Sequence, residues 1–167
     1  MCYNRSRFVR EGKKDMQGVI KAVCISEKKG TEKHPVPCAH LTVQHGIDGD
    51  AHAGPWHRQV SLLSYDKVEE FNRHGGQVED GAFGENLLVK GIDFRSLPLG
   101  TVFTTENTKL RLTQIGKECH SHCAIYHRVG MCIMPHEGVF AEVLVGGDVA
   151  PGEVMTVTLP EAQEPQE

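Results

Sequence analysis

The 167-residue sequence contains no long apolar run. No stretch approaches the ~20 consecutive apolar residues that a membrane-spanning helix requires. The N-terminal region also lacks the apolar core of a secretory signal peptide. These two absences disfavour a membrane-spanning or exported protein, and they predict a cytoplasmic one.

An excess of positive charge is also lacking. The chain has 18 Lys and Arg residues against 22 Asp and Glu residues, which gives a net charge of −4. A protein of this charge offers no basic field to a phosphate backbone, so nucleic acid is not an expected partner. Neither a Gly-rich dinucleotide fingerprint nor a P-loop is present, which disfavours a nucleotide-dependent enzyme.

Length and composition fit a single globular domain. Hydrophobic residues make up 39% of the chain and charged residues 24%, which is ordinary for a folded domain of this size. No linker or low-complexity stretch interrupts it. We expect one domain over residues 16–159, preceded by a flexible extension over residues 1–15 and followed by a disordered tail over residues 160–167.

Short β-strands dominate the predicted secondary structure. Apolar, β-rich pieces alternate with Gly-rich or polar turns, a pattern typical of a β-barrel or sandwich. The fold class that we predict is therefore mainly β, with a closed or partly open barrel and few short helices. The expected strands are Gly18–Ser26, Leu41–Gln44, Gln59–Leu63, Glu85–Val89, Gly100–Thr105, Lys109–Gln114, Val139–Val145 and Val154–Leu159.

The pattern also predicts how some of these pieces connect. Residues 106–108 read as a hairpin turn, and residues 146–148 as the turn between the last two strands, which we expect to pair. Pro98–Val102 and Ala150–Val154 both place a Gly just before a strand, which indicates two similar strand entries.

Two helices are predicted. Apolar residues at positions 65, 68 and 71 form one face of a helix over Tyr65–Arg73, which Ser64 can cap and Gly75 can end. These three side chains are expected in the core. A second helix is expected over His120–Val129.

Six cysteines are present, at positions 2, 24, 38, 119, 123 and 132. Without an export signal we expect reduced thiols instead of a disulfide framework. Cys24 stands inside an apolar run, so it should be a buried, inert thiol.

Two Gly-rich stretches can be interpreted either as ligand-binding loops or as tight turns of the chain. Gly46–Arg58 contains two Asp, two His and one Arg, and such a loop can present N–H groups and imidazoles to an anion. The alternative is a tight connection whose glycines serve turn geometry. Gly81–Ile92 places Gly-Glu-Asn before an apolar strand. This sequence can present an acceptor and an amide beside a flexible backbone, and a structural turn explains it equally well.

The most distinctive stretch is Gln114–Pro135, which holds three cysteines and three histidines. One interpretation is a zinc site that uses Cys119, Cys123, Cys132 and a histidine, although the spacing matches no standard pattern closely. Another makes Cys119 a reactive thiol, because Lys117 and His120 beside it lower the pKa of a thiol. Buried structural cysteines are the third possibility, and spacing alone does not separate the three.

Taken in order, these stretches resemble the MOSC family, named for the C-terminal domain of molybdenum-cofactor sulfurases. The resemblance covers roughly residues 16–159 and looks like the small bacterial branch that occurs alone or fused to a molybdopterin-biosynthesis domain. Each motif is weak alone, and their order is what makes the match specific. The motifs are GDAHAG (49–54), GAFGENL (81–87), LGTVF (99–103), LTQIGKEC (112–119) and GGDVAPGEVMTV (146–157).

The resemblance implies a mostly β fold around a barrel and an essential cysteine, which the motif match puts at Cys119. That cysteine carries sulfur as a persulfide or coordinates molybdenum through its thiolate, with Lys117 and His120 beside it. The activity implied is that of a sulfurtransferase or of a molybdenum-cofactor-dependent reductase. A non-enzymatic module that delivers cofactor or zinc to another protein is the alternative.

The implied cofactor is the molybdenum cofactor, and its phosphate needs donors. The implied partners are molybdenum-cofactor biosynthesis proteins or a cysteine desulfurase, with a small-molecule substrate also possible. The chain departs from many members, which carry Pro–Arg before the cysteine loop and Pro before the cysteine, where this chain has Ile115–Gly116 and Glu118. The residues predicted to bind the cofactor are His57, Arg58, Gly84, Glu85, Asn86 and Gln114, together with Lys117.

Overall fold

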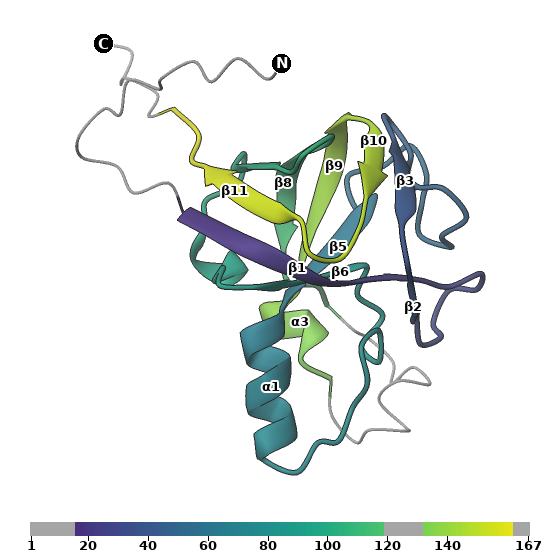
Figure 1. Cartoon of the computed structure of the whole chain (residues 1–167), viewed down its shortest axis with the longest axis vertical. Helices are drawn as coiled ribbons and strands as arrows, with labels where there is room; N and C mark the ends of the chain where they lie inside the picture. Colours follow the sequence, from purple (N-terminus) through teal and green to yellow (C-terminus); the bar gives the residue numbers. More distant parts are fainter. Residues whose placement is uncertain (1–15, 119–131, 162–167) are drawn as a thin grey trace, which may run out of the picture.

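The computed structural model describes residues 16–118 and 132–161 and contains a closed barrel of seven strands (Figure 1). Strands β5 and β6 run parallel, and the other neighbouring pairs of the ring run antiparallel. In order around the ring the strands are β11 (Val154–Thr158), β7 (Val102–Thr104), β8 (Lys109–Ile115), β9 (Val139–Val145), β5 (Val60–Ser64), β6 (Leu87–Lys90) and β1 (Met16–Ile25).

Strand β1 closes the ring because it pairs with both β11 and β6 along its ten residues. Residues 16–19 pair with β11, and residues 19–23 pair with β6 across an irregularity at Lys21. Its last residues pair with β2 (His34–Val36), which lies outside the ring. The prediction of a mainly β barrel is thus confirmed.

The barrel interior and one flank of the barrel hold separate apolar clusters. Residues of β1 divide between them, and the irregularity at Lys21 shifts the alternation: Ile20 and Val23 join the interior cluster, whereas Ala22 and Cys24 join the flank cluster. The flank cluster includes residues of α1 (Tyr65–Arg73) and α3 (Met134–Glu137), the two helices below the barrel in Figure 1. Strand β5 is buried along its whole length because both of its faces are covered.

Helix α1 has the bounds that its periodicity predicts, Tyr65–Arg73. Val68 is buried in the flank cluster, and Tyr65 and Phe71 are partly buried against it, so the expected apolar face is confirmed. Ser64 occupies the N-cap position, but its side chain makes no capping hydrogen bond. A short 3-10 helix, η1 (Phe94–Ser96), was not predicted from the sequence.

Two predicted connections are wrong. Residues 147–149 form strand β10 (Gly147–Val149) instead of a turn, and it pairs with β3 (Ala39–Thr42), which also pairs with β4 (Gly46–Ile47) in a separate three-stranded sheet. Strands β9 and β11 do not pair, because β9 lies between β8 and β5 while β11 lies between β7 and β1. The hairpin that joins β7 to β8 is confirmed.

The prediction that two strands begin after similar Gly-containing turns is confirmed. Gly100 and Gly152 have φ angles of 91° and 94°, which glycine adopts readily. In each case the next residue donates its N–H to the carbonyl three residues earlier, at Pro98 and Ala150 respectively. These turns lead into β7 and β11, which are neighbours in the barrel.

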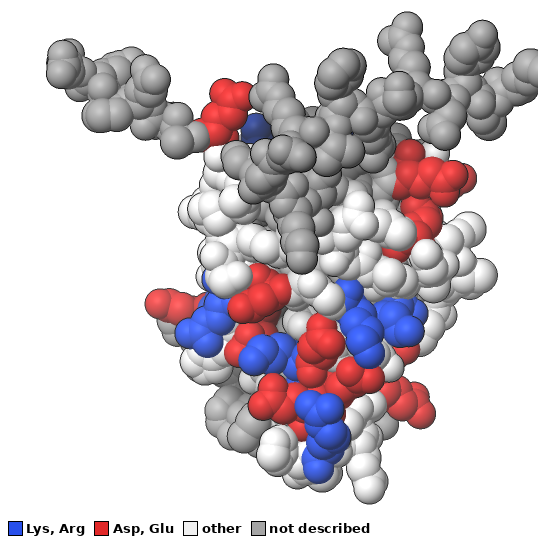
Figure 2. All heavy atoms as spheres, turned by 60° about the vertical axis from the view of Figure 1, so that its left-hand side comes forward, with Lys and Arg blue, Asp and Glu red and all other residues white. Residues whose placement is uncertain are grey.

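The predicted helix over residues 120–129 lies outside the described residues, as do the expected extension over residues 1–15 and most of the expected tail. Among the helices of the described part, none is long and apolar enough to cross a membrane. Figure 2 shows one face of the protein, where acidic and basic side chains alternate around α1. Ion pairs of this region include Lys67–Glu70 and Lys90–Glu69, so neither charge dominates there.

We predict that Asn86→Ala lowers the free energy of unfolding by about 2–4 kcal/mol, because it removes three buried hydrogen bonds. Asn86 Oδ1 accepts from the N–H and hydroxyl of Ser61 at 3.0 and 3.1 Å, and its amide donates to the carbonyl of Cys24 at 3.0 Å. These bonds tie the start of β6 to β5 and β1. Urea denaturation measures the effect, and Gln17→Ala, an exposed change on β1, is the control. Equal midpoints for both variants would contradict the prediction.

Candidate functional site

A small pocket of about 100 Å³ brings together three of the predicted site residues, Arg58, Gly84 and Lys117. We call it the Arg58 pocket. Arg58 stands just before β5, Gly84 before β6, and Lys117 just after β8. The other polar residues of its lining are Thr31, His52 and Ser61, and the large apolar ones are Phe83, Met134 and Phe140.

Aromatic rings hold Arg58, and no carboxylate of the described residues forms an ion pair with it. Its guanidinium carbon lies 4.5 Å from the centre of the Trp56 ring and 5.5 Å from that of the Phe140 ring. The Trp56 indole is fixed in turn by donating to the carbonyl of His52 at 2.8 Å. The buried Nε of Arg58 has no hydrogen-bond partner among the described residues. A guanidinium group with a donor that is not used by these residues can bind an anionic ligand.

Lys117 owes its position to the turn at Gly116. Gly116 has a φ angle of 68°, and a Cβ atom there would lie 2.5 Å from the carbonyl oxygen of Pro135. The N–H of Gly116 donates to Gly138 and that of Lys117 donates to Pro135, at 2.7 and 3.1 Å. Helix α3 therefore anchors the end of β8 and presents Lys117 at the pocket.

His57 and Gln114 are also brought together, at an exposed position outside the lining of this pocket. His57 Nε2 lies 2.7 Å from Gln114 Oε1, and the Gln114 amide nitrogen donates to the carbonyl of Gly116 at 2.8 Å. This assignment makes His57 Nε2 the donor. The pair thus supports the turn that carries Lys117.

Glu85 and Asn86 are fully buried, and their polar atoms serve the protein interior. The Glu85 carboxylate accepts from the N–H groups of Gly81 and Phe83 at 2.5 and 3.0 Å. Burial raises the pKa of Glu85 to about 7, against the lowering effect of these hydrogen bonds. Within this motif Phe83 and Gly84 line the Arg58 pocket, whereas Glu85 and Asn86 do not.

A buried ion pair fixes the loop that leads to Arg58. Lys33 Nζ lies 2.7 Å from Asp50 Oδ1, and the two side chains are 0% exposed. Asp50 also accepts from the N–H groups of Ser26 and His52, each at 3.1 Å. Sequence reasoning noted the Asp and His residues of this loop but missed Lys33, which stands in a charged turn that gives no local sign of burial.

His52 is the third acceptor of the Lys33 ammonium group. Nζ lies 3.0 Å from His52 Nδ1 and 3.1 Å from Ser26 Oγ, besides its contact with Asp50. Since an ammonium group can only donate, Nδ1 is the acceptor, and the proton of the neutral ring sits on Nε2. Burial first, and then the charge of Lys33, lower the pKa of His52 to about 4, and Lys117 and Lys29 act in the same direction against Asp50. The ring is neutral near pH 7.

Cys119, His120 and Cys123 lie outside the described residues, so their predicted roles stay predictions. Cys132 is described and half-buried, and Cys24 is fully buried as expected. Burial, followed by repulsion from Glu85, raises the pKa of Cys24 to about 12, which makes it unreactive. No group of three or more potential metal ligands occurs within residues 16–118 and 132–161.

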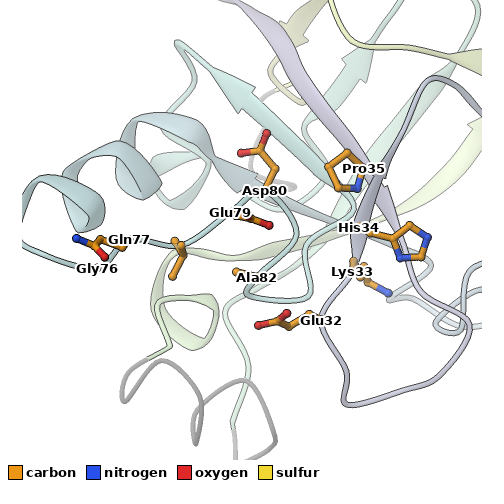
Figure 3. Close-up of a pocket in the computed structure, with 10 residues that line it drawn as sticks. Glu32, Lys33, His34, Pro35, Gly76, Gln77, Glu79, Asp80 and Ala82 are labelled. Carbon is orange, nitrogen blue, oxygen red and sulfur yellow. The ribbon is translucent and has the colours of Figure 1, made fainter.

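A larger pocket of about 380 Å³ lies elsewhere and contains none of the predicted site residues (Figure 3). Its lining joins residues 32–35, around the start of β2, to the loop that follows α1. Burial, and then the neighbouring Glu79, raise the pKa of Asp80 above its ordinary value. Because the carboxylates of Glu79 and Asp80 line this pocket, it does not favour an anion.

Comparison with known proteins identifies a family. The family model of the MOSC domain matches residues 48–156, more than half of the chain. A comparison with curated proteins gives no match.

Three solved structures share the fold. The YuaD protein from Bacillus subtilis aligns with a TM-score of 0.72 and 18% identity, over 89% of this chain and 99% of that chain. YiiM from Escherichia coli aligns with a TM-score of 0.64 and 16% identity, over 89% and 72% of the two chains. YiiM from Geobacillus stearothermophilus gives 0.59 and 17%, over 86% and 74%.

We predict that Glu85 makes stability depend on pH. The folded state raises the pKa of Glu85 from 4.5 to about 7, so the protonated form favours folding. Its contribution is fully present below about pH 4.5 and is lost as the pH rises through about 7. Glu85→Gln mimics the protonated form, and the wild type should therefore lose about 3 kcal/mol relative to this variant between those limits. Urea denaturation at several pH values tests this, and a constant difference between the two proteins would contradict it.

Proposed function

Because the chain belongs to the MOSC domain family, whose function is related to the molybdenum cofactor, we propose that the Arg58 pocket binds the phosphate or another anionic group of that cofactor. We propose further that Cys119 carries the chemistry, either as a persulfide or as a thiolate ligand of molybdenum. The observation that carries the proposal is the convergence of Arg58, Gly84 and Lys117, from three separate stretches of the sequence, on one pocket.

The pocket suits an anion in charge and in size. It combines a guanidinium whose buried Nε has no partner among the described residues with the ammonium group of Lys117. Its volume of about 100 Å³ is smaller than the roughly 300 Å³ at which pockets for whole small molecules begin. The pocket therefore fits one anionic group of a cofactor and leaves the rest of it outside.

The proposed reactive thiol follows a residue of this pocket closely in the sequence. Cys119 follows Lys117 by two residues, a chain length that spans at most about 7 Å when extended. A cation this near favours the thiolate, which is both the nucleophilic form and a soft metal ligand.

Sulfur carriage needs a donor persulfide, and we propose a cysteine desulfurase in that role. The Cys119 thiolate attacks the outer sulfur of the donor persulfide, the S–S bond of the donor breaks, and the donor leaves as a thiolate. Cys119 is then a persulfide, and no net oxidation occurs.

When bound, the molybdenum cofactor would supply a redox-active, thiophilic metal centre. The residues that would hold it are Arg58 and Lys117 for an anionic group, the backbone around Gly84, and Cys119 as the thiolate. His57 and Gln114 would act indirectly, through the Gly116 turn that they support.

We predict that the wild type binds sulfate saturably and that Arg58→Gln weakens this binding roughly tenfold or more, because a charge-assisted hydrogen bond is lost. Trp56 is the single tryptophan of the chain and lies against Arg58, so its fluorescence reports occupancy. Calorimetry provides an independent readout in case the substitution alters the emission of Trp56.

The matched control for this experiment is Arg73→Gln, which removes an exposed arginine at the end of α1. It should leave sulfate binding unchanged. Equal binding by both variants, or no saturable binding by the wild type, would exclude the anion pocket.

We predict that incubation with a cysteine desulfurase and cysteine adds the mass of one sulfur atom to Cys119. Cys119→Ser should abolish this adduct. Cys38→Ser, which removes an exposed free thiol, should retain it. Mass spectrometry of the intact protein and its peptides measures the result.

An adduct that survives in Cys119→Ser would show that another thiol accepts the sulfur. If no adduct forms although Cys119 is readily alkylated, direct binding of the molybdenum cofactor becomes the preferred role. A Cys119 that also resists alkylation would exclude both roles.

A further inference from the structure

We propose that His52 is a binding residue of the Arg58 pocket, donating a hydrogen bond from Nε2–H of its neutral ring, and that the buried Lys33–Asp50 pair holds it in this state. The inference rests on the proposed anion pocket and deepens it, because it adds an uncharged donor to the two cations. The ligand that fits such a set is a fully ionised oxyanion, whose oxygens all accept.

The first step of the argument is the tautomer. Lys33 has three N–H bonds, and the structure gives it three acceptors within 3.1 Å: Asp50, Ser26 and His52. None of these contacts can be reversed, because the ammonium group has no lone pair. His52 is therefore forced to accept at Nδ1 and to carry its proton at Nε2.

The second step concerns the opposite edge of the ring. His52 lines the Arg58 pocket, and Nδ1 is already occupied by Lys33 on the protein side. Within the described part of the chain no hydrogen bond is found for Nε2, and Nε2 is not among the buried polar atoms that lack a partner. The donor therefore remains available to a ligand in the pocket.

The third step is the charge of the ring. Among the residues that the structure describes, the charged groups that act on His52 are the cations Lys33, Lys117 and Lys29 and the anion Asp50. Burial and these cations oppose protonation, and Asp50 cannot compensate because its carboxylate is engaged by Lys33. His52 is thus a constant donor near neutral pH and not a switchable cation.

Two substitutions at His52 separate its two hydrogen bonds. In His52→Gln the terminal amide nitrogen stands near the place of Nε2, so the donor is kept and the contact with Lys33 is lost. In His52→Asn the side-chain oxygen stands near the place of Nδ1, so the contact with Lys33 is kept and the donor is lost. Both variants leave the Lys33–Asp50 pair intact.

The probe is inorganic sulfate, which does not titrate near neutral pH, and binding is followed by Trp56 fluorescence and by calorimetry. We expect His52→Asn to weaken binding roughly tenfold or more, and His52→Gln to stay close to the wild type. The ratio of wild-type to His52→Asn affinity should be constant between about pH 5.5 and 8, whereas an ordinary, protonatable histidine would make it fall as the pH rises.

The outcomes separate this inference from the proposed function. If His52→Asn binds sulfate as the wild type does while Arg58→Gln does not, the anion pocket stands and the role of His52 is overturned. Equal weakening by His52→Asn and His52→Gln, or a ratio that falls with pH, also overturns it. Absence of saturable binding by the wild type overturns the pocket and the role of His52 together. Melting temperatures of both variants, unchanged within a few degrees, confirm that folding is intact.

Discussion

The buried contact between Lys33 and Asp50 is the interaction on which the geometry of the site depends. With both side chains 0% exposed, neither charge can be left alone, since removing one partner of such a pair costs about 3–5 kcal/mol. The pair joins three parts of the chain: Lys33 at the end of the charged turn, Ser26 directly after β1, and the Gly-rich loop that leads to Arg58. It also dictates which nitrogen of His52 carries a proton. The Lys33–Asp50 pair thereby stabilises the fold and also determines the tautomer of the neighbouring His52.

Barrel topology accounts for the convergence of motifs that are far apart in the sequence. Strands β5 and β6 are adjacent and parallel, so both begin at the same end of the barrel. Arg58 and Gly84, which precede them, therefore lie at that end. Lys117 arrives by a different route, through the left-handed turn at Gly116 that packs against Pro135. Helix α3 thus belongs to the site, because it supports that turn and contributes Met134 to the pocket lining.

Local patterns in the sequence predicted those features that depend on neighbouring residues in the chain. The 3.6-residue period gave the bounds of α1, and the apolar run around Cys24 gave its burial. The order of motifs indicated the family and placed Arg58, Gly84 and Lys117 among the candidate residues. What the sequence could not predict depends on distant partners. Strand β10 exists because Gly147 meets Leu41, more than a hundred residues away, and Lys33 is buried because Asp50 lies opposite it.

Charge, and not volume, is the ground for preferring the Arg58 pocket to the larger pocket as the proposed anion site. The larger one, about 380 Å³, is lined by the carboxylates of Glu32, Glu79 and Asp80. Burial, and then the neighbouring Glu79, raise the pKa of Asp80. The smaller one, about 100 Å³, holds Arg58 and Lys117 beside a histidine that its surroundings keep neutral. In a chain of net charge −4, an anionic ligand needs such a local concentration of donors, because the protein as a whole repels it. The size of the smaller pocket would limit the bound part of the proposed cofactor to a single anionic group.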